Sequence, residues 1–237
     1  MKTHDLLLGV GIEEIPDWMI AGALEDFRRR LLDALEKLQL QQGVEVEAHA
    51  TPRRLVLFAR NIPVKQADAK EAVTGPPVAA GPGATQGFAR KMGVEPEQLK
   101  KVQTPKGEYY SYTRKVKGRL TRELLREMLP AVILGITWPK TMTWTGRSGP
   151  RFIRPIRRLV AIYGGRVVPF AIAGLKTCNL ATGHRRLGSD RIRVSDLESL
   201  REGLRQNFVL LDAAERRGRI EQGIAQLLSG TSLRWRR

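Results

Sequence analysis

The sequence of 237 residues is poor in the side chains from which reactive centres are commonly built. It has one cysteine, Cys178, and three histidines. A single cysteine excludes an internal disulfide bond and any zinc site with several cysteine ligands. Cys178 and His184 alone do not complete a metal coordination shell, so no metal site is predicted. A reducing compartment is the simplest setting, and the predicted location is cytoplasmic.

Long hydrophobic runs are also missing. No segment reaches the roughly 18 uninterrupted apolar residues of a membrane span. The apolar start of the chain is followed by Glu13 and Glu14 without a small-residue cleavage site, which argues against a signal peptide. We therefore expect no membrane partner. A hydrophobic content of 42% is nevertheless enough for a buried core.

Recognisable catalytic motifs are absent as well. The sequence has neither a phosphate-binding loop of the form G-x-x-x-x-G-K-[ST] nor a G-x-S-x-G nucleophile elbow. Glu13 and Glu14 form a carboxylate pair, but adjacent residues of an extended chain point to different sides. Acids in a turn that approaches a helix are the favoured interpretation. No catalytic residue is predicted, although carboxylate chemistry in a stand-alone enzyme remains an open alternative.

Acidic residues are missing from one long segment, residues 128–189. This segment contains ten basic residues: Lys140, Arg147, Arg151, Arg154, Arg157, Arg158, Arg166, Lys176, Arg185 and Arg186. The whole chain has a formal charge of +17 and a pI near 10.7. Since solvated surfaces normally mix both signs of charge, the segment favours a polyanionic partner. The alternative is a basic proteome that spreads its charge everywhere.

The hydrophobic pattern predicts an α+β fold of small, mostly antiparallel sheets packed with helices. Residues 1–63 read as strand, helix, strand, strand. An apolar stripe predicts a long helix from Pro16-Asp17 to near Gly43, with its members at Ile20, Leu24, Phe27, Leu31, Leu35 and Leu38. Residues 64–106 are expected to be a Pro/Gly-rich connection with short helices.

The second half divides into three predicted parts. Residues 107–194 form a basic α+β region, with a hairpin at Gly164-Gly165. Residues 195–230 form a helical segment, in which Ser195 with Glu198 and Asp212 with Glu215 have the spacing of capping boxes. Residues 231–237 carry no clear structural signal.

Basic side chains near strand ends are the candidate RNA-binding residues. They are Arg53 and Arg54 after a Thr-Pro turn, Lys140, Arg151, Arg154, Arg157 and Arg158 before a strand, and the turn residues His184, Arg185 and Arg186. Guanidinium groups can donate two hydrogen bonds to one phosphate. The aromatic residues Tyr109, Tyr110, Tyr112, Trp138 and Trp144 are candidates for base stacking, with burial in the core as the favoured alternative.

Seven stretches in order resemble one known family. They are GVGIEEIPDWMI (9–20), ATPRRLVLFARNI (50–62), VTGPPVAA with GATQGFARKMGV (73–94), GEYYSYTRKVKG (107–118), GITWPKTMTW (135–144), RFIRPIRRLVAIYGGRVVPFAIAGLKTCNLATGHRR (151–186) and NFVLLDAAERRGRI (207–220). Together they resemble the N-terminal part of the β subunit of bacterial tetrameric glycyl-tRNA synthetase. Ile12, Arg158, Cys178 and Arg186 depart from the family pattern, and the family subunit is much longer.

The resemblance implies a specific role. In this family the α subunit of an α2β2 assembly activates glycine with ATP and transfers it to tRNA-Gly, while the β subunit holds tRNA. The N-terminal region of the β subunit is similar to the body and tail domains of archaeal CCA-adding enzymes. The resemblance therefore implies a non-catalytic module for the acceptor end of tRNA that binds no cofactor itself. The alternative is an assembly module whose main partner is the α subunit.

Overall fold

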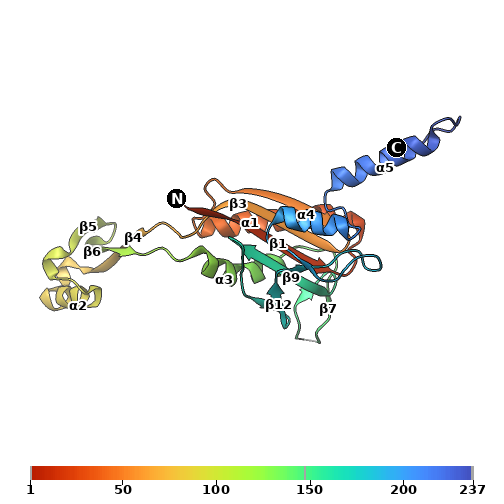
Figure 1. Ribbon diagram of the computed structural model, residues 1–237. Helices are drawn as coiled ribbons and strands as arrows, with labels where there is room; N and C mark the ends of the chain where they lie inside the picture. The colour runs from red at the N-terminus through yellow and green to blue at the C-terminus, as the bar shows by residue number, and fades with distance from the viewer. Residues whose placement is uncertain (1, 147, 236–237) are drawn as a thin grey trace. The chain divides into compact units, whose positions relative to one another are not determined.

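The computed structural model describes residues 2–146 and 148–235, so Arg147 and the last two residues of the 231–237 tail lie outside the described residues. The chain forms two compact units (Figure 1). Unit 1 comprises residues 1–64 and 120–237, and unit 2 comprises residues 65–119. Unit 2 is thus inserted into the sequence of unit 1. The expected boundary between residues 106 and 107 differs from this division, because it would separate two paired strands of unit 2.

A seven-stranded sheet forms the centre of unit 1, in the order β11-β12-β9-β1-β3-β2, with β10 paired to β9. The strands are β1 (Thr3–Ile12), β2 (Glu45–Thr51), β3 (Arg54–Pro63), β9 (Ile156–Tyr163), β10 (Arg166–Val167), β11 (Ala171–Ile172) and β12 (Leu175–Cys178). Only the β12–β9 pair in this sheet is parallel among the described strands. The predicted α+β class with mostly antiparallel sheets is confirmed. The Gly164-Gly165 hairpin is confirmed too, since β9 and β10 pair directly.

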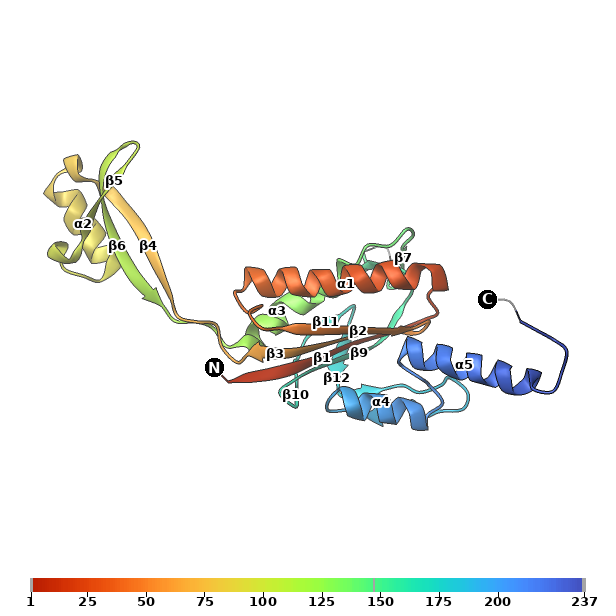
Figure 2. The same cartoon turned by 90° about the horizontal axis from the view of Figure 1, so that it is seen from above.

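Helices cover both faces of this sheet (Figure 2). On one face, α1 (Asp17–Lys37) and α3 (Thr121–Leu134) share a hydrophobic core with Leu6, Leu8 and Val10. On the other face, α4 (Leu197–Gln206) packs through its buried leucines against Leu7. Successive residues of a strand point to opposite faces, so the continuous apolar run of β1 serves both cores.

The apolar stripe of α1 is confirmed at Phe27, Leu31 and Leu35, which are fully buried. In its first half the buried residues are Met19 and Ala23, whereas the predicted Ile20 and Leu24 are only partly buried. The helix ends at Lys37, earlier than predicted. The chain then turns at Gln39, which has a positive φ of 55°.

The remaining elements of unit 1 are short or peripheral. They are the strand pairs β7 (Met142–Thr143) with β8 (Arg151–Phe152) and β13 (Leu180–Ala181) with β14 (Ile192–Arg193), and the helix α5 (Ala213–Leu228). Asp212 caps α5 by accepting from the N–H groups of Ala214 and Glu215, but the Glu215 carboxylate accepts from Arg205 instead of completing the predicted capping box. The cap of α4 is shifted by one residue from the prediction, because Asp196 and Ser199 form the capping box.

Unit 2 is a three-stranded antiparallel sheet with a helix on it. Its elements are β4 (Ala69–Pro77), η1 (Val78–Ala80), α2 (Pro82–Met92), η2 (Pro96–Gln98), β5 (Lys100–Thr104) and β6 (Gly107–Val116), and the strand order is β4-β6-β5. Phe88, Ala89 and Leu99 form its small core. The expected connection, residues 64–106, therefore contains two strands, β4 and β5. Strand β4 tolerates Pro76 and Pro77 because it lies at a sheet edge, where they need no ladder hydrogen bond. No described helix in either unit is long and apolar enough to cross a membrane.

Candidate nucleic-acid interface

Two glycines of β1 leave a hollow on the α4 side of the sheet. Leu7 faces α4, so the alternation of the strand places Gly9 and Gly11 on the same face. In the sheet register, Gly11 lies between Arg54 of β3 and Arg158 of β9. A Cβ atom at Gly11 would lie only 3.2 Å from the Cβ atom of Arg158. The missing side chains therefore open a space between two arginines.

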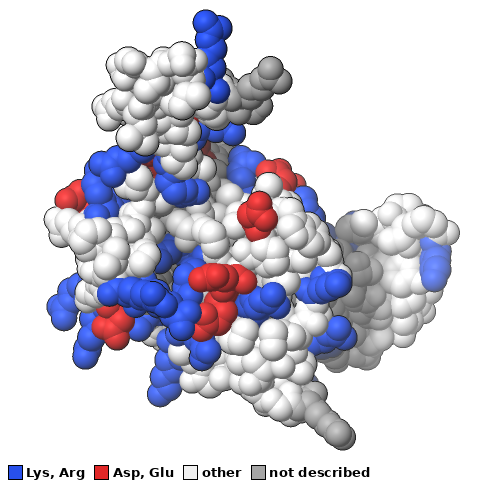
Figure 3. Space-filling view, turned by 90° about the vertical axis from the view of Figure 1, so that its right-hand side faces the viewer, with Lys and Arg blue, Asp and Glu red and all other residues white. Residues whose placement is uncertain are grey.

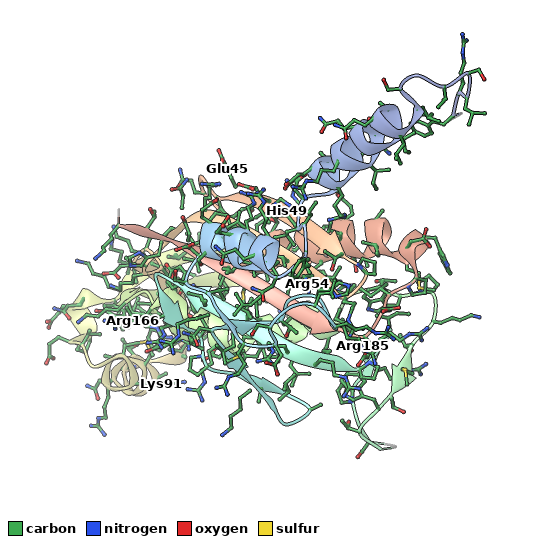
Figure 4. All side chains as sticks on the ribbon, turned by 45° about the vertical axis from the view of Figure 1, so that its right-hand side comes forward. Glu45, His49, Arg54, Lys91, Arg166 and Arg185 are labelled. Carbon is green, nitrogen blue, oxygen red and sulfur yellow. The ribbon has the colours of Figure 1, made fainter. Side chains whose placement is uncertain are left out.

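A pocket of about 280 Å³ occupies this space, and we call it the arginine pocket. It is lined by the end of β1, the starts of β3 and β9, and the segment 181–190. Its apolar lining comes from Val56, Val160, Ala181 and Leu200, and its described basic residues are Arg53, Arg54, Arg157, Arg158 and Arg185. Figure 4 shows Arg54 and Arg185 at one end of the sheet and Arg166 at the other.

A second depression, of about 450 Å³, adjoins the arginine pocket. The two share Arg53 and Arg185, and the second adds Arg154, Glu13 and Glu14. Among the charged side chains on the face seen in Figure 3, Lys and Arg predominate, and Asp and Glu form smaller patches. Acidic side chains are thus present in this region, but in the minority.

Glu13 holds two arginines at the rim of these depressions. Its carboxylate accepts from Nε of Arg157 at 2.7 Å and from Nη2 of Arg53 at 3.0 Å. The hydrogen bond from Arg157 lowers the pKa of Glu13, and the charge of Arg53 adds to this effect. Its backbone N–H donates to the carbonyl of Pro155 at 3.2 Å. The turn before α1 is therefore tied to the entrance of β9, and the acids act as partners of basic residues.

Arg54 is the most strongly desolvated of these basic groups. Its Nη1 donates to the carbonyl of Thr182 at 2.7 Å, while its buried Nε has no hydrogen-bond partner in the described structure. Burial, together with the neighbouring charge of Arg53, lowers the pKa of Arg54 to about 10. The guanidinium remains charged near neutral pH. It thus presents a concentrated positive charge in a place with little water to screen it.

The turn at residues 183–189 is held in place by the end of α4. The N–H of His184 donates to the carbonyl of Asn207 at 2.8 Å, and the N–H of Ser189 donates to Oδ1 of Asn207 at 2.7 Å. A Cβ atom at Gly183 would lie 2.5 Å from that of Asn207, so the close approach requires glycine. This anchoring places Arg185 beside the arginine pocket.

The structure brings six of the ten sequence-predicted residues together. Arg53, Arg54, Arg154, Arg157, Arg158 and Arg185 line the two adjoining depressions. Lys140 and Arg151 lie apart from them, near the β7–β8 pair, where Nε of Arg151 donates to Oγ1 of Thr141. Nδ1 of His184 accepts from the N–H groups of Arg186 and Leu187, so this imidazole stabilises its own turn.

Sequence reasoning missed Gly9, Gly11, Thr182 and Asp190 as pocket residues. The two glycines could have been found from the sequence, because residues two apart in a strand lie on the same face, and two glycines there leave that face without side chains. Trp138 is buried and packs edge-on against Phe152, with ring centroids 5.4 Å apart. Tyr110 and Tyr112 pack on the core of unit 2. No cluster of three metal-ligating side chains occurs among the described residues.

Comparison with known proteins decides the family. The sequence model of a family described as glycyl-tRNA synthetase beta subunit matches residues 6–236. The chain belongs to this family. Among curated relatives, the glycine–tRNA ligase beta subunit of Syntrophotalea carbinolica is 38% identical over 95% of this chain and 34% of its own length. That of Geobacter sulfurreducens is 37% identical over 94% of this chain and 33% of its own length.

A third relative supports the same assignment over a shorter stretch. The glycine–tRNA ligase beta subunit of Acidobacterium capsulatum is 41% identical over 78% of this chain and 27% of its own length. The chain spans about a third of the length of the curated relatives it matches. The family resemblance of the seven sequence stretches is thereby confirmed, and the relatives are subunits of a ligase.

Proposed function

We propose that this chain is a non-catalytic tRNA-binding module of a glycyl-tRNA synthetase β subunit. In this proposal, the chain presents the arginine pocket and its surroundings to phosphates at the acceptor end of tRNA-Gly. The α subunit of the α2β2 assembly, in the cytoplasm, uses ATP to attach glycine, and this chain binds no cofactor. The proposal extends to the fold, which we take to be similar to the body and tail domains of archaeal CCA-adding enzymes.

The convergence of arginines from three chain segments carries the proposal. The segments are far apart in sequence, yet they surround two adjoining depressions, to which they contribute Arg53, Arg154 with Arg157, and Arg185. Such a concentration of like charge is unfavourable in isolation, and a bound polyanion would offset it. The family assignment supports RNA as the polyanion.

Filter binding of tRNA acceptor minihelices tests this function. At about 50 mM and about 200 mM salt, the affinity should fall steeply, because each neutralised phosphate releases counterions. Arg158→Ala should weaken binding, whereas Arg166→Ala, which removes an exposed arginine outside the pockets, is the matched control. Absence of binding at low salt, or equal loss in both variants, would contradict the proposal.

Contact with the α subunit is a second candidate function, favoured by α5. This helix has no buried residue among those described, and it exposes Ile220 and Leu227, the latter 82% accessible. Exposed apolar side chains at this density suit a protein partner. Size-exclusion chromatography with light scattering of this chain mixed with the α subunit tests the contact. A complex lost in Leu227→Asp but kept in Arg158→Ala would favour assembly over RNA binding.

A further inference from the structure

We infer that the arginine pocket receives a single unpaired nucleotide of the bound RNA. This inference rests on the proposed RNA-binding function and gives the pocket a role distinct from that of the surrounding surface. A surface of arginines needs no recess to bind backbone phosphates. The hollow above Gly9 and Gly11 is therefore the feature that calls for a specific occupant.

The size of the pocket suits one small group. Its volume of about 280 Å³ lies just below the roughly 300–1,000 Å³ of small-molecule sites. Paired bases are enclosed within a double helix, where such a recess cannot reach them. A base in a single-stranded segment can be turned out of the stack and enter.

The chemistry of the lining suits a nucleotide better than a bare phosphate. Val56, Val160 and Leu200 provide apolar surface against which a flat base can lie. Gly9 and Gly11 permit close approach to the strand itself. Asp190 also lines the pocket, and its carboxylate can accept only from donors such as an exocyclic amine or a ribose hydroxyl. A bare phosphate or a carboxylate ligand would be repelled by Asp190 and would leave the apolar lining unused.

The basic groups available for the phosphate are the ones that form no ion pair with a carboxylate in the described part of the chain. Arg53 and Arg157 are ion-paired with Glu13, but Arg158 and Arg185 form no ion pair within the described part of the chain. The Nε donor of Arg54 is buried and has no partner there. Guanidinium groups bind phosphates through paired hydrogen bonds and also stack on bases. Arg54, Arg158 and Arg185 can thus hold a nucleotide whose base occupies the apolar part.

A pair of RNA hairpins tests the inference with the full chain. One hairpin is blunt, and the other has the same stem with a short single-stranded 3′ extension. The extension should increase affinity roughly tenfold, as expected for one well-packed base. Gly9→Val should bring the affinity ratio of the two RNAs towards one without changing any charge, because its side chain fills the hollow. The nearest atom to a Cβ at residue 9 is Cβ of Val160 at 3.4 Å, an ordinary van der Waals contact, so the first atom of the added side chain fits beside the strand.

Two further variants keep the result interpretable. Arg158→Met removes one guanidinium from the pocket and should also lower the affinity ratio, even if Gly9→Val fails to fold. Arg166→Ala should leave the ratio unchanged. Two results would overturn the inference while leaving the proposed RNA binding intact. One is equal affinity of the wild-type chain for the two RNAs, and the other is an unchanged affinity ratio in both Gly9→Val and Arg158→Met. If neither RNA binds, the proposed function itself fails.

A free mononucleotide separates the two sources of the ligand. Millimolar AMP should reduce the affinity for the extended hairpin to that for the blunt one. If AMP binds the chain but the extension adds no affinity, the pocket serves free nucleotides, and the assignment to RNA is wrong.

Discussion

Replacing Arg54 with methionine should make the protein more stable and a poorer RNA binder. Burial lowers the pKa of Arg54 to about 10, well below its usual value. At about 1.4 kcal/mol per pKa unit, holding the charge in this place costs about 3 kcal/mol. The hydrogen bond to the carbonyl of Thr182 offsets about 1.5–3 kcal/mol of this cost, which is the usual contribution of a hydrogen bond to a charged group. Methionine keeps the apolar stem, so we expect a net gain of about 1 kcal/mol.

The assay combines urea unfolding with filter binding on the same preparations. The RNA affinity of Arg54→Met should fall, and its salt dependence should become shallower by about one phosphate contact. Arg166→Met, at an exposed arginine of the same sheet, controls for the loss of charge. A variant that is less stable than wild type by more than about 1 kcal/mol, with unchanged RNA binding, would refute the reasoning, since Arg54 would then be a purely structural residue.

Three other substitutions test separate parts of the structure. Burial would raise the pKa of Asp26, but hydrogen bonds from Arg30, the Thr137 N–H and Arg29 lower it to about 2. Asp26→Asn should therefore lower the free energy of unfolding by about 2 kcal/mol, measured in urea at pH 6. A lowered carboxyl pKa stabilises fully above the unfolded value, and the contribution is lost as the pH falls to the folded value. The difference should therefore vanish as the pH falls from about 4 to about 2, and a pH-independent difference would contradict it. Gly75→Ala would place a Cβ atom 2.5 Å from the ring of Phe88. This clash should lower the free energy of unfolding of unit 2 by about 1–3 kcal/mol. Hydrogen exchange should then become faster in residues 65–119 but not in β1. Glu13→Gln removes the carboxylate that competes for Arg53 and Arg157 and should tighten binding of minihelices about two- to threefold at low salt; weaker binding would show that Glu13 is needed to position the arginines.

Local patterns predicted several of the elements, but not how they pair. The stripe containing Phe27, Leu31 and Leu35 predicted α1, because helix periodicity is encoded within one segment. Strand β4 escaped prediction because its prolines and glycine at residues 75–77 are typical of loops. Only the edge position of β4 in its sheet makes them acceptable. That position depends on β6, which lies some 30 residues later.

The candidate site, too, depends on contacts between distant parts of the chain that local sequence patterns do not predict. Four of the six basic residues of the site, Arg154, Arg157, Arg158 and Arg185, lie in the acid-free stretch 128–189. Arg53 and Arg54 lie outside it, and the stretch also contains basic residues elsewhere in the structure. Arg54 and Arg158 become neighbours only because both pair with Gly11 across β1. Such long-range register is set by the whole sheet and cannot be derived from spacing along the chain. The depth of the pocket depends on residues that have no side chain, which a search for functional groups overlooks.

The insertion of unit 2 has a consequence for how the chain can vary. Both of its junctions are fastened to the same place in unit 1, because the backbone N–H of Thr121 donates to the carbonyl of Val64 at 3.0 Å and its hydroxyl donates to the carbonyl of Pro63. With respect to the folding of unit 1, residues 65–119 therefore act as a loop with fixed ends. The entropic cost of closing a loop rises only with the logarithm of its length. Lengthening, shortening or exchanging the inserted unit therefore changes the stability of the seven-stranded sheet very little. Residues 65–119 can therefore be replaced by another inserted unit, in natural variation or by design, while the arginine pocket stays intact.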